Sequence, residues 1–125
     1  AIGVKPKVLD KLTNLDHGLW QGMLVEEVRT KQPKVYRQWQ DRPQTICPPD
    51  GETVLQAKTR VAEVLRKLIK KHKEGTIALV APEPLTSVIR HVLQHEELTG
   101  LWKCSEKCGL WESIQAPEAV VAGVA

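Results

Sequence analysis

The chain has 125 residues, of which 42% are hydrophobic and 26% are charged, and its formal net charge is +3 at pH 7. These values are typical of a soluble globular protein of one domain, or of a piece of one. They give no sign of a nucleic-acid partner, because the one local basic cluster, Arg66–Lys73, is explained as the solvated end of a helix.

The sequence also lacks the features of membrane and secreted proteins. No stretch approaches the roughly 20 apolar residues of a membrane span. Lys5 and Lys7 are not followed by the long apolar region of a signal peptide. Three cysteines are an odd number, which argues against a disulfide framework. We therefore expect a cytoplasmic protein that does not contact a membrane.

The first part of the chain predicts irregular structure. Lys7–Leu12 has an ambiguous pattern that is compatible with a short edge strand. Leu12–Gly22 contains two glycines and an Asp-His-Gly turn signal, so we expect an ordered loop. Loops that carry Trp and His on a rigid scaffold are commonly functional. The alternative is that Leu15 and Trp20 fill one end of the core.

Three helices are expected next. Met23–Lys31 is a short amphipathic helix, and Pro33 suits the first position of a second short helix. After the proline-rich loop Gln44–Gly51, Thr53–His72 predicts the longest helix, with Thr53 as N-cap and Gln56 completing a capping box. Its apolar stripe consists of Val54, Ala57, Val61, Val64, Leu65, Leu68 and Ile69.

The run Thr76–Ala81 is short, apolar and uncharged, which is typical of a strand buried on both faces of a parallel sheet. The helical spacing of apolar residues in Leu85–His95 predicts a helix directly after it. In open α/β sheets, ligands bind beyond the carboxyl ends of the strands, which here is Pro82-Glu83-Pro84. Two prolines remove two backbone donors and Glu83 adds a negative charge, so this turn does not suit an anion.

The last part of the chain predicts one more strand and a tail. Gly109–Gln115 alternates in polarity and is expected to be a strand, and Ala116–Ala125 is small, apolar and featureless. We therefore expect one truncated α/β domain over residues 1–115 and an Ala/Val-rich tail over residues 116–125. Because few strands are available, the Thr76–Ala81 strand needs a partner segment or a second copy of the chain to cover its edge.

A metal site is not expected. His91 and His95, followed by Cys104 and Cys108, form a four-ligand set on paper. The Cys-x-x-x-Cys spacing is not that of common zinc sites, however, and the two histidines fall on the side of their helix opposite the apolar face. We expect no metal and no cofactor.

Four stretches, in order and at matching spacing, resemble the second half of the phosphoglycerate-mutase-like histidine phosphatases. Leu12–Gly22 is similar to the family's Leu-Arg-Glu-Ile-x-x-Gly-x-Trp-Glu-Gly, and Arg60-Val61 to an Arg-Val pair in its long helix. The others are Trp39, Pro43 and Pro48–Thr53, which resemble a Trp, a Pro and Pro-Pro-Gly-Gly-Glu-Ser, and Ile77–Ala81, which resembles the strand before Ser-His-Gly. The resemblance implies a partial phosphoglycerate-mutase-like three-layer fold, with a mostly parallel sheet and helices packed on it.

The resemblance also implies a reaction for which this chain lacks the residues. The family transfers a phosphoryl group to the His of an Arg-His-Gly, and this sequence contains no Arg-His-Gly. Asn14 stands at the position of the proton-donating Glu, and Pro82 and Glu83 stand at those of the second His and its Gly. Asp16 or His17 is the remaining candidate proton donor. The residues expected to line the pocket are Asp16, His17, Trp20, Gly51, Glu52 and Glu83.

Three functions remain open at this point. The first is a histidine-phosphatase-fold domain that is inactive as the chain stands. The second is a phosphomonoesterase or mutase whose Arg-His-Gly half is missing from this chain, and which would take a phosphorylated small molecule once completed. The third is a non-enzymatic interaction module that uses the four tryptophans Trp20, Trp39, Trp102 and Trp111, although packing in the core is the simpler role for them.

Overall fold

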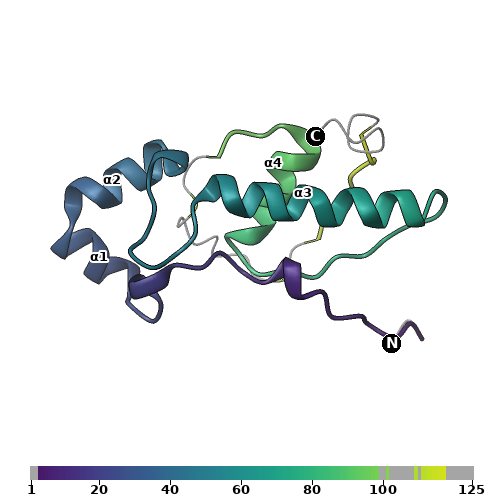
Figure 1. Ribbon diagram of the computed structural model, residues 1–125, viewed down its shortest axis with the longest axis horizontal. Helices are drawn as coiled ribbons and strands as arrows, with labels where there is room; N and C mark the ends of the chain where they lie inside the picture. The colour runs from purple at the N-terminus through teal and green to yellow at the C-terminus, as the bar shows by residue number, and fades with distance from the viewer. Residues whose placement is uncertain (1–2, 99–100, 102–108, 110, 118–125) are drawn as a thin grey trace.

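The computed structural model describes residues 3–98, 101, 109 and 111–117. Its helices are α1 (Val25–Lys31), α2 (Pro33–Asp41), α3 (Val54–Lys71) and α4 (Leu85–Gln94). Three 3₁₀ turns lie in the connecting segments: η1 (Asp10–Leu12) and η2 (Gly18–Trp20) before α1, and η3 (Pro43–Thr45) between α2 and α3. Figure 1 shows α4 crossing the long helix α3, while α1 and α2 lie together near the N-terminal end of α3.

Helix α3 forms where the sequence predicts it, and for the predicted reason. The Thr53 side chain accepts a hydrogen bond from the Gln56 amide at 3.1 Å, and the Gln56 side chain accepts one from the Thr53 amide at 2.8 Å. This capping box satisfies two backbone donors that the first helical turn cannot pair. One face of the helix is buried, through Val54, Ala57, Val61, Val64 and Leu65.

Helix α4 supplies the other half of the core. Its apolar residues Leu85, Val88, Ile89 and Val92 are all buried and belong to the same cluster as the α3 stripe. Burying a large aliphatic side chain contributes roughly 1.5–3 kcal/mol, so the contact between α3 and α4 stabilises the fold substantially. The chain leaves α4 through His95, which adopts a left-handed conformation with φ of 57°.

Helices α1 and α2 pack on each other near the N-terminal end of α3 (Figure 1). Helix α1 begins at Val25 rather than at the predicted Met23, and Glu27 caps it by accepting a hydrogen bond from the Leu24 amide at 2.9 Å. Helix α2 begins with Pro33 at its first position, as predicted. Its Trp39 has no exposed surface and is a centre of the core.

The predicted sheet is not found: the residues that the structure describes form no strand. Thr76–Ala81 has no strand assignment and turns back along α3 (Figure 1). Leu79 and Ala81 pack partly against the core, whereas Val80 is fully exposed at 101%. The prediction that this run is buried on both faces is therefore wrong for this chain. A strand needs a neighbour to share its hydrogen-bond ladder, and the residues that the structure describes supply none for this run.

The two other predicted strands are also not formed in the described residues. Lys7–Leu12 runs as irregular chain and ends in the 3₁₀ turn η1. Gly109 and residues 111–115 have no strand assignment, and Leu110 lies outside the described residues. Of the predicted tail, residues 118–125 also lie outside them. No helix in the described part of the chain is both long enough and apolar enough to cross a membrane.

Candidate functional site

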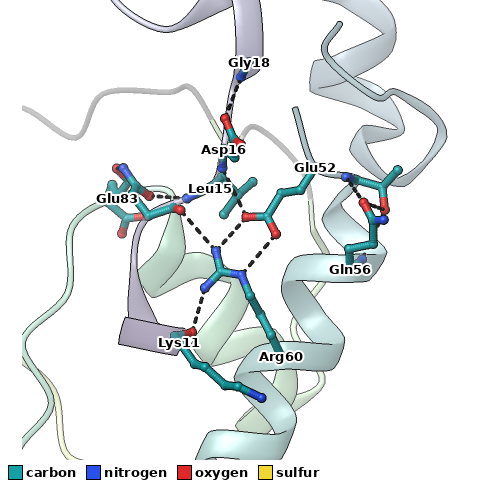
Figure 2. A network of polar contacts seen from close by, with 10 residues as sticks. Lys11, Leu15, Asp16, Gly18, Glu52, Gln56, Arg60 and Glu83 are labelled. Carbon is teal, nitrogen blue, oxygen red and sulfur yellow. Dashed lines mark hydrogen bonds and ion pairs between the residues drawn. The ribbon is translucent and has the colours of Figure 1, made fainter. Parts of the chain in front are cut away.

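Arg60 of α3 ties together two loops that are distant in the sequence (Figure 2). Its guanidinium forms two contacts with the Glu52 carboxylate, at 3.0 Å from Nε and 2.6 Å from Nη2. It also donates to the backbone carbonyls of Lys11 at 2.7 Å and Asn14 at 3.1 Å. The Arg60 and Glu52 side chains are only 20% and 17% exposed. We call this set of four residues the Arg60 clamp.

The loop around Gly18 then packs directly on the loop around Gly51. The Leu19 amide donates to the Pro49 carbonyl at 2.9 Å. The Glu52 amide donates to the Asp16 carbonyl at 3.0 Å, and the Asp16 amide donates to the Glu52 carboxylate at 3.1 Å. The Asp16 side chain accepts from the Gly18 amide at 2.9 Å (Figure 2). Asp16 and Glu52 are therefore occupied in holding the backbone.

A cavity of about 230 Å³ opens beside these loops, between η2, the start of α1 and the turn before α4. Asn14 forms part of its wall, and its side-chain amide donates to the Glu83 carbonyl at 3.1 Å across 69 residues of sequence. We call this cavity the Asn14 pocket. It is lined by Asn14, His17, Trp20, Gln21, Gly22, Met23, Val25, Val28, Glu83 and Pro84.

A larger cavity of about 500 Å³ lies elsewhere, beside the start of α3 and the end of α4. Its lining includes Asp41, Lys58, His91 and Glu97, and it shares no residue with the Asn14 pocket. Of the candidate site and ligand residues that the sequence singled out, only His91, weighed there as a metal ligand, is among the described residues that line it.

His17 lies at the inner wall of the Asn14 pocket. Its ring centre is 6.1 Å from that of Trp39, which in turn meets Trp20 edge to face at 6.0 Å. Burial lowers the pKa of His17 below its ordinary value of 6.5, although the Leu15 backbone and the Asp16 and Glu52 carboxylates oppose the shift. The imidazole is therefore neutral at neutral pH.

This lowered pKa predicts a pH dependence of stability. In the unfolded chain the imidazole of His17 is protonated as the pH falls through 6.5, whereas in the folded chain it is protonated only at a lower pH. The stability contributed by the neutral imidazole is therefore present above pH 6.5 and is lost as pH falls through the folded pKa. We expect the urea midpoint of the wild type to fall more steeply between pH 7 and 5 than that of His17→Gln. Parallel curves for the two proteins would contradict this.

Glu83 is held at the start of α4 by its own helix. Its carboxylate accepts a hydrogen bond from the Ser87 hydroxyl at 2.9 Å and pairs with Arg90 at 2.8 Å. Burial by itself raises the pKa of Glu83, but the Thr86 and Ser87 hydroxyls and Arg90 outweigh it and lower the pKa below its ordinary value. Arg90 also contacts Glu112 at 3.3 Å. Glu83 is thus an anion, and Arg90 lies between two carboxylates.

The structure brings together some of the residues that the sequence singled out and separates others. Asn14, His17, Trp20 and Glu83 line one pocket. Asp16, Gly51 and Glu52 belong to the packed loops behind it, and Pro82 is exposed beside it.

Sequence reasoning missed the apolar wall of the pocket and the bonds of the Arg60 clamp. It also missed the pair of Glu83, which precedes α4, and Arg90, which lies within it seven residues later. That spacing is the one signal that could have revealed the pair.

No group of three or more His, Cys, Asp and Glu side chains in the described part of the chain is arranged to hold a metal ion. The ring Nδ1 of His91 contacts the Glu96 carbonyl, and His95 lies beyond the end of α4. Cys104 and Cys108, the other two members of the set that the sequence analysis weighed and did not favour, lie outside the described residues.

Comparison with known proteins places this geometry in a family. The sequence profile of the histidine phosphatase superfamily (branch 1) matches residues 1–111. The chain is 36% identical over 72 residues to phosphoserine phosphatase 1 of Hydrogenobacter thermophilus, which covers 58% of this chain and 34% of that protein. It is 28% identical over 95 residues to the bifunctional protein Rv2228c of Mycobacterium tuberculosis, covering 74% of this chain and 26% of that protein.

These matches span about a third of the first relative's length and about a quarter of the second's. The profile match, in contrast, extends over most of the chain, and it agrees with the motifs at Leu12–Gly22 and Pro48–Thr53. The chain belongs to the histidine phosphatase superfamily.

Proposed function

We propose that this chain is a histidine-phosphatase-fold domain that does not itself transfer phosphoryl groups. The observation that carries the proposal is the contact between the Asn14 side-chain amide and the Glu83 carbonyl at 3.1 Å. By the family resemblance, Asn14 occupies the position of the proton donor, and Pro82 and Glu83 occupy those of the second His and its Gly. An amide is not an acid, and proline has no N–H to offer a phosphate.

The charges around the pocket support the same proposal. Phosphoryl transfer depends on positive groups that stabilise the charge of the transferring phosphate. The side chains that line the Asn14 pocket include no Lys and no Arg. Two arginines near these loops are both paired with carboxylates, Arg60 with Glu52 and Arg90 with Glu83 and Glu112.

A phosphatase assay tests the proposal. We expect no hydrolysis of p-nitrophenyl phosphate or phosphoserine above background, with the Hydrogenobacter thermophilus phosphatase as the positive control. His17→Ala serves as the matched variant, because His17 is the remaining candidate proton donor in the pocket. Turnover by the wild type that His17→Ala abolishes would refute the proposal, since a contaminating enzyme would not respond to that change.

The second candidate is a phosphomonoesterase or mutase that another segment completes. It is favoured by the 36% identity to a phosphoserine phosphatase of which this chain matches only 34%. It predicts an Arg-His-Gly in the coding sequence before Ala1, and activity once that segment is present. A partner segment or a second copy would then cover the exposed side of Thr76–Ala81.

The interaction-module alternative loses support from the burial of its aromatic residues. Trp20 is 7% exposed and Trp39 is fully buried, so these two are part of the core. Trp111 is 88% exposed, and Trp102 lies outside the described residues. A cytoplasmic location stays a prediction.

A further inference from the structure

The Asn14 pocket has two chemically different walls. Its apolar wall comes from η2, α1 and the segment between them, and it contains Trp20, Met23, Val25 and Val28. The opposite wall is more polar, and among the described residues that line the pocket Glu83 is the one with an acidic side chain. Small-molecule sites commonly combine an apolar lining with a few placed polar groups of this kind.

We propose that the Asn14 pocket binds a small organic cation, of the primary-ammonium class with an apolar or aromatic body, in preference to a phosphate. The inference rests on the proposed absence of phosphoryl transfer, because it assigns the pocket a ligand of the opposite charge. The body of the ligand lies against the apolar wall, and its ammonium group faces Glu83.

The carboxylate of Glu83 retains room for such a ligand. An ionised carboxylate has about four lone-pair positions. Arg90 uses one oxygen and the Ser87 hydroxyl uses the other, and the Glu83 side chain remains 50% exposed. Arg90 also pairs with Glu112, so these three charged groups together keep one net negative charge. An ammonium group that approaches from the pocket compensates that charge.

The same turn is unfavourable to an anion. The N-terminus of a helix attracts negative charge, but at α4 the chain's own Glu83 carboxylate already fills that role through Ser87. Pro84 precedes the first residue of the helix and has no N–H to donate. Burial keeps His17 neutral by lowering its pKa, so the pocket gains no cation at neutral pH.

Trp20 adds an aromatic surface to the apolar wall. Its ring packs edge to face on Trp39, which fixes its orientation in the core. Aromatic rings attract cations placed over their faces, and they also stack with aromatic ligands. Benzylammonium combines both features in a molecule of few atoms, and benzyl alcohol is its neutral counterpart.

Titration of the ¹⁵N-labelled chain with benzylammonium at pH 7.5 and low salt tests the inference by NMR. We expect saturable shifts at the Trp20 indole and the Gly22 amide. We expect benzyl alcohol to bind at least several-fold more weakly and inorganic phosphate to cause no saturable shift at either signal. Glu83→Gln removes the charge and is expected to weaken benzylammonium binding roughly ten- to hundred-fold.

Two further variants test whether a charge acts on benzylammonium binding only when it lies at the pocket. Val25→Lys places a positive charge at the rim from a side chain that is already 38% exposed, and it is expected to abolish benzylammonium binding. Glu74→Gln removes an exposed carboxylate beyond the end of α3 and is expected to leave the affinity unchanged.

Equal affinity for benzylammonium and benzyl alcohol would overturn the inference, as would full affinity in Glu83→Gln. Tighter binding of phosphate than of benzylammonium would overturn it as well. The proposed function is judged separately, by turnover: a chain that neither binds the cation nor hydrolyses phosphate esters refutes only this inference. A chain that hydrolyses them in a His17-dependent manner refutes the proposed function.

Discussion

Replacing Arg60 by methionine is expected to lower the free energy of unfolding by about 3 kcal/mol, because removing one partner of a largely buried ion pair leaves the other as an uncompensated charge. The change leaves the Glu52 carboxylate 17% exposed without its guanidinium, and it removes the donors to the Lys11 and Asn14 carbonyls. Methionine keeps the length of the side chain and is compatible with the helix, so the loss reports on the bonds themselves. Urea denaturation monitored by circular dichroism measures it.

A double-mutant cycle with Glu52→Gln tests whether the two residues act as a pair. The double variant Arg60→Met, Glu52→Gln is expected to lose clearly less free energy of unfolding than the sum of the losses of the two single variants. In the double variant neither side chain is left as an uncompensated charge. The matched control is Arg29→Met, which removes a pair with Glu26 in which both side chains are more than half exposed. We expect that change to cost less than about 0.5–1 kcal/mol. A cost at Arg60 no greater than at Arg29 would contradict the structural role of the Arg60 clamp.

Gly18→Ala is expected to be the second severe change, with a loss of about 3 kcal/mol or more. A methyl group at Gly18 would lie 2.0 Å from the Pro49 carbonyl oxygen and 2.5 Å from the Gly51 nitrogen. Both are backbone atoms of the facing loop and cannot turn away as a side chain would. The φ of +52° at Gly18 adds the strain of a left-handed conformation.

Gly22→Ala is the control that separates strain from contact. Gly22 has a φ of +82°, and a methyl group there would meet nothing within 4 Å. We expect it to cost about 1–2 kcal/mol, from the backbone conformation alone. Thermal and urea unfolding of the two variants side by side measures the difference. Equal losses would show that the close approach of the two loops does not contribute.

The reliable part of the sequence prediction concerned short-range structure. Helix α3 and its capping box follow from Thr53, Gln56 and a regular apolar stripe, all of which lie within a few turns of one another. The start of α2 at Pro33 follows from the fixed φ of proline. The failed predictions, in contrast, concerned strands, which form only where another strand is available for pairing. Thr76–Ala81 has the composition of a buried strand, but its six residues find no second strand in the described chain.

The sequence by itself determined the helices to within a few residues, the capping box of α3 and the family, because these depend on residues close together or on motifs in a fixed order. Only the tertiary structure decided that Asn14 meets Glu83 across 69 residues, that Arg60 holds Glu52, and that Asp16 supports the backbone instead of lining the pocket. These contacts join segments whose separation along the chain carries no periodic signal. Their formation depends on how α3 and α4 pack, and that packing brings the two loops and the Glu83 turn to the same end of the core.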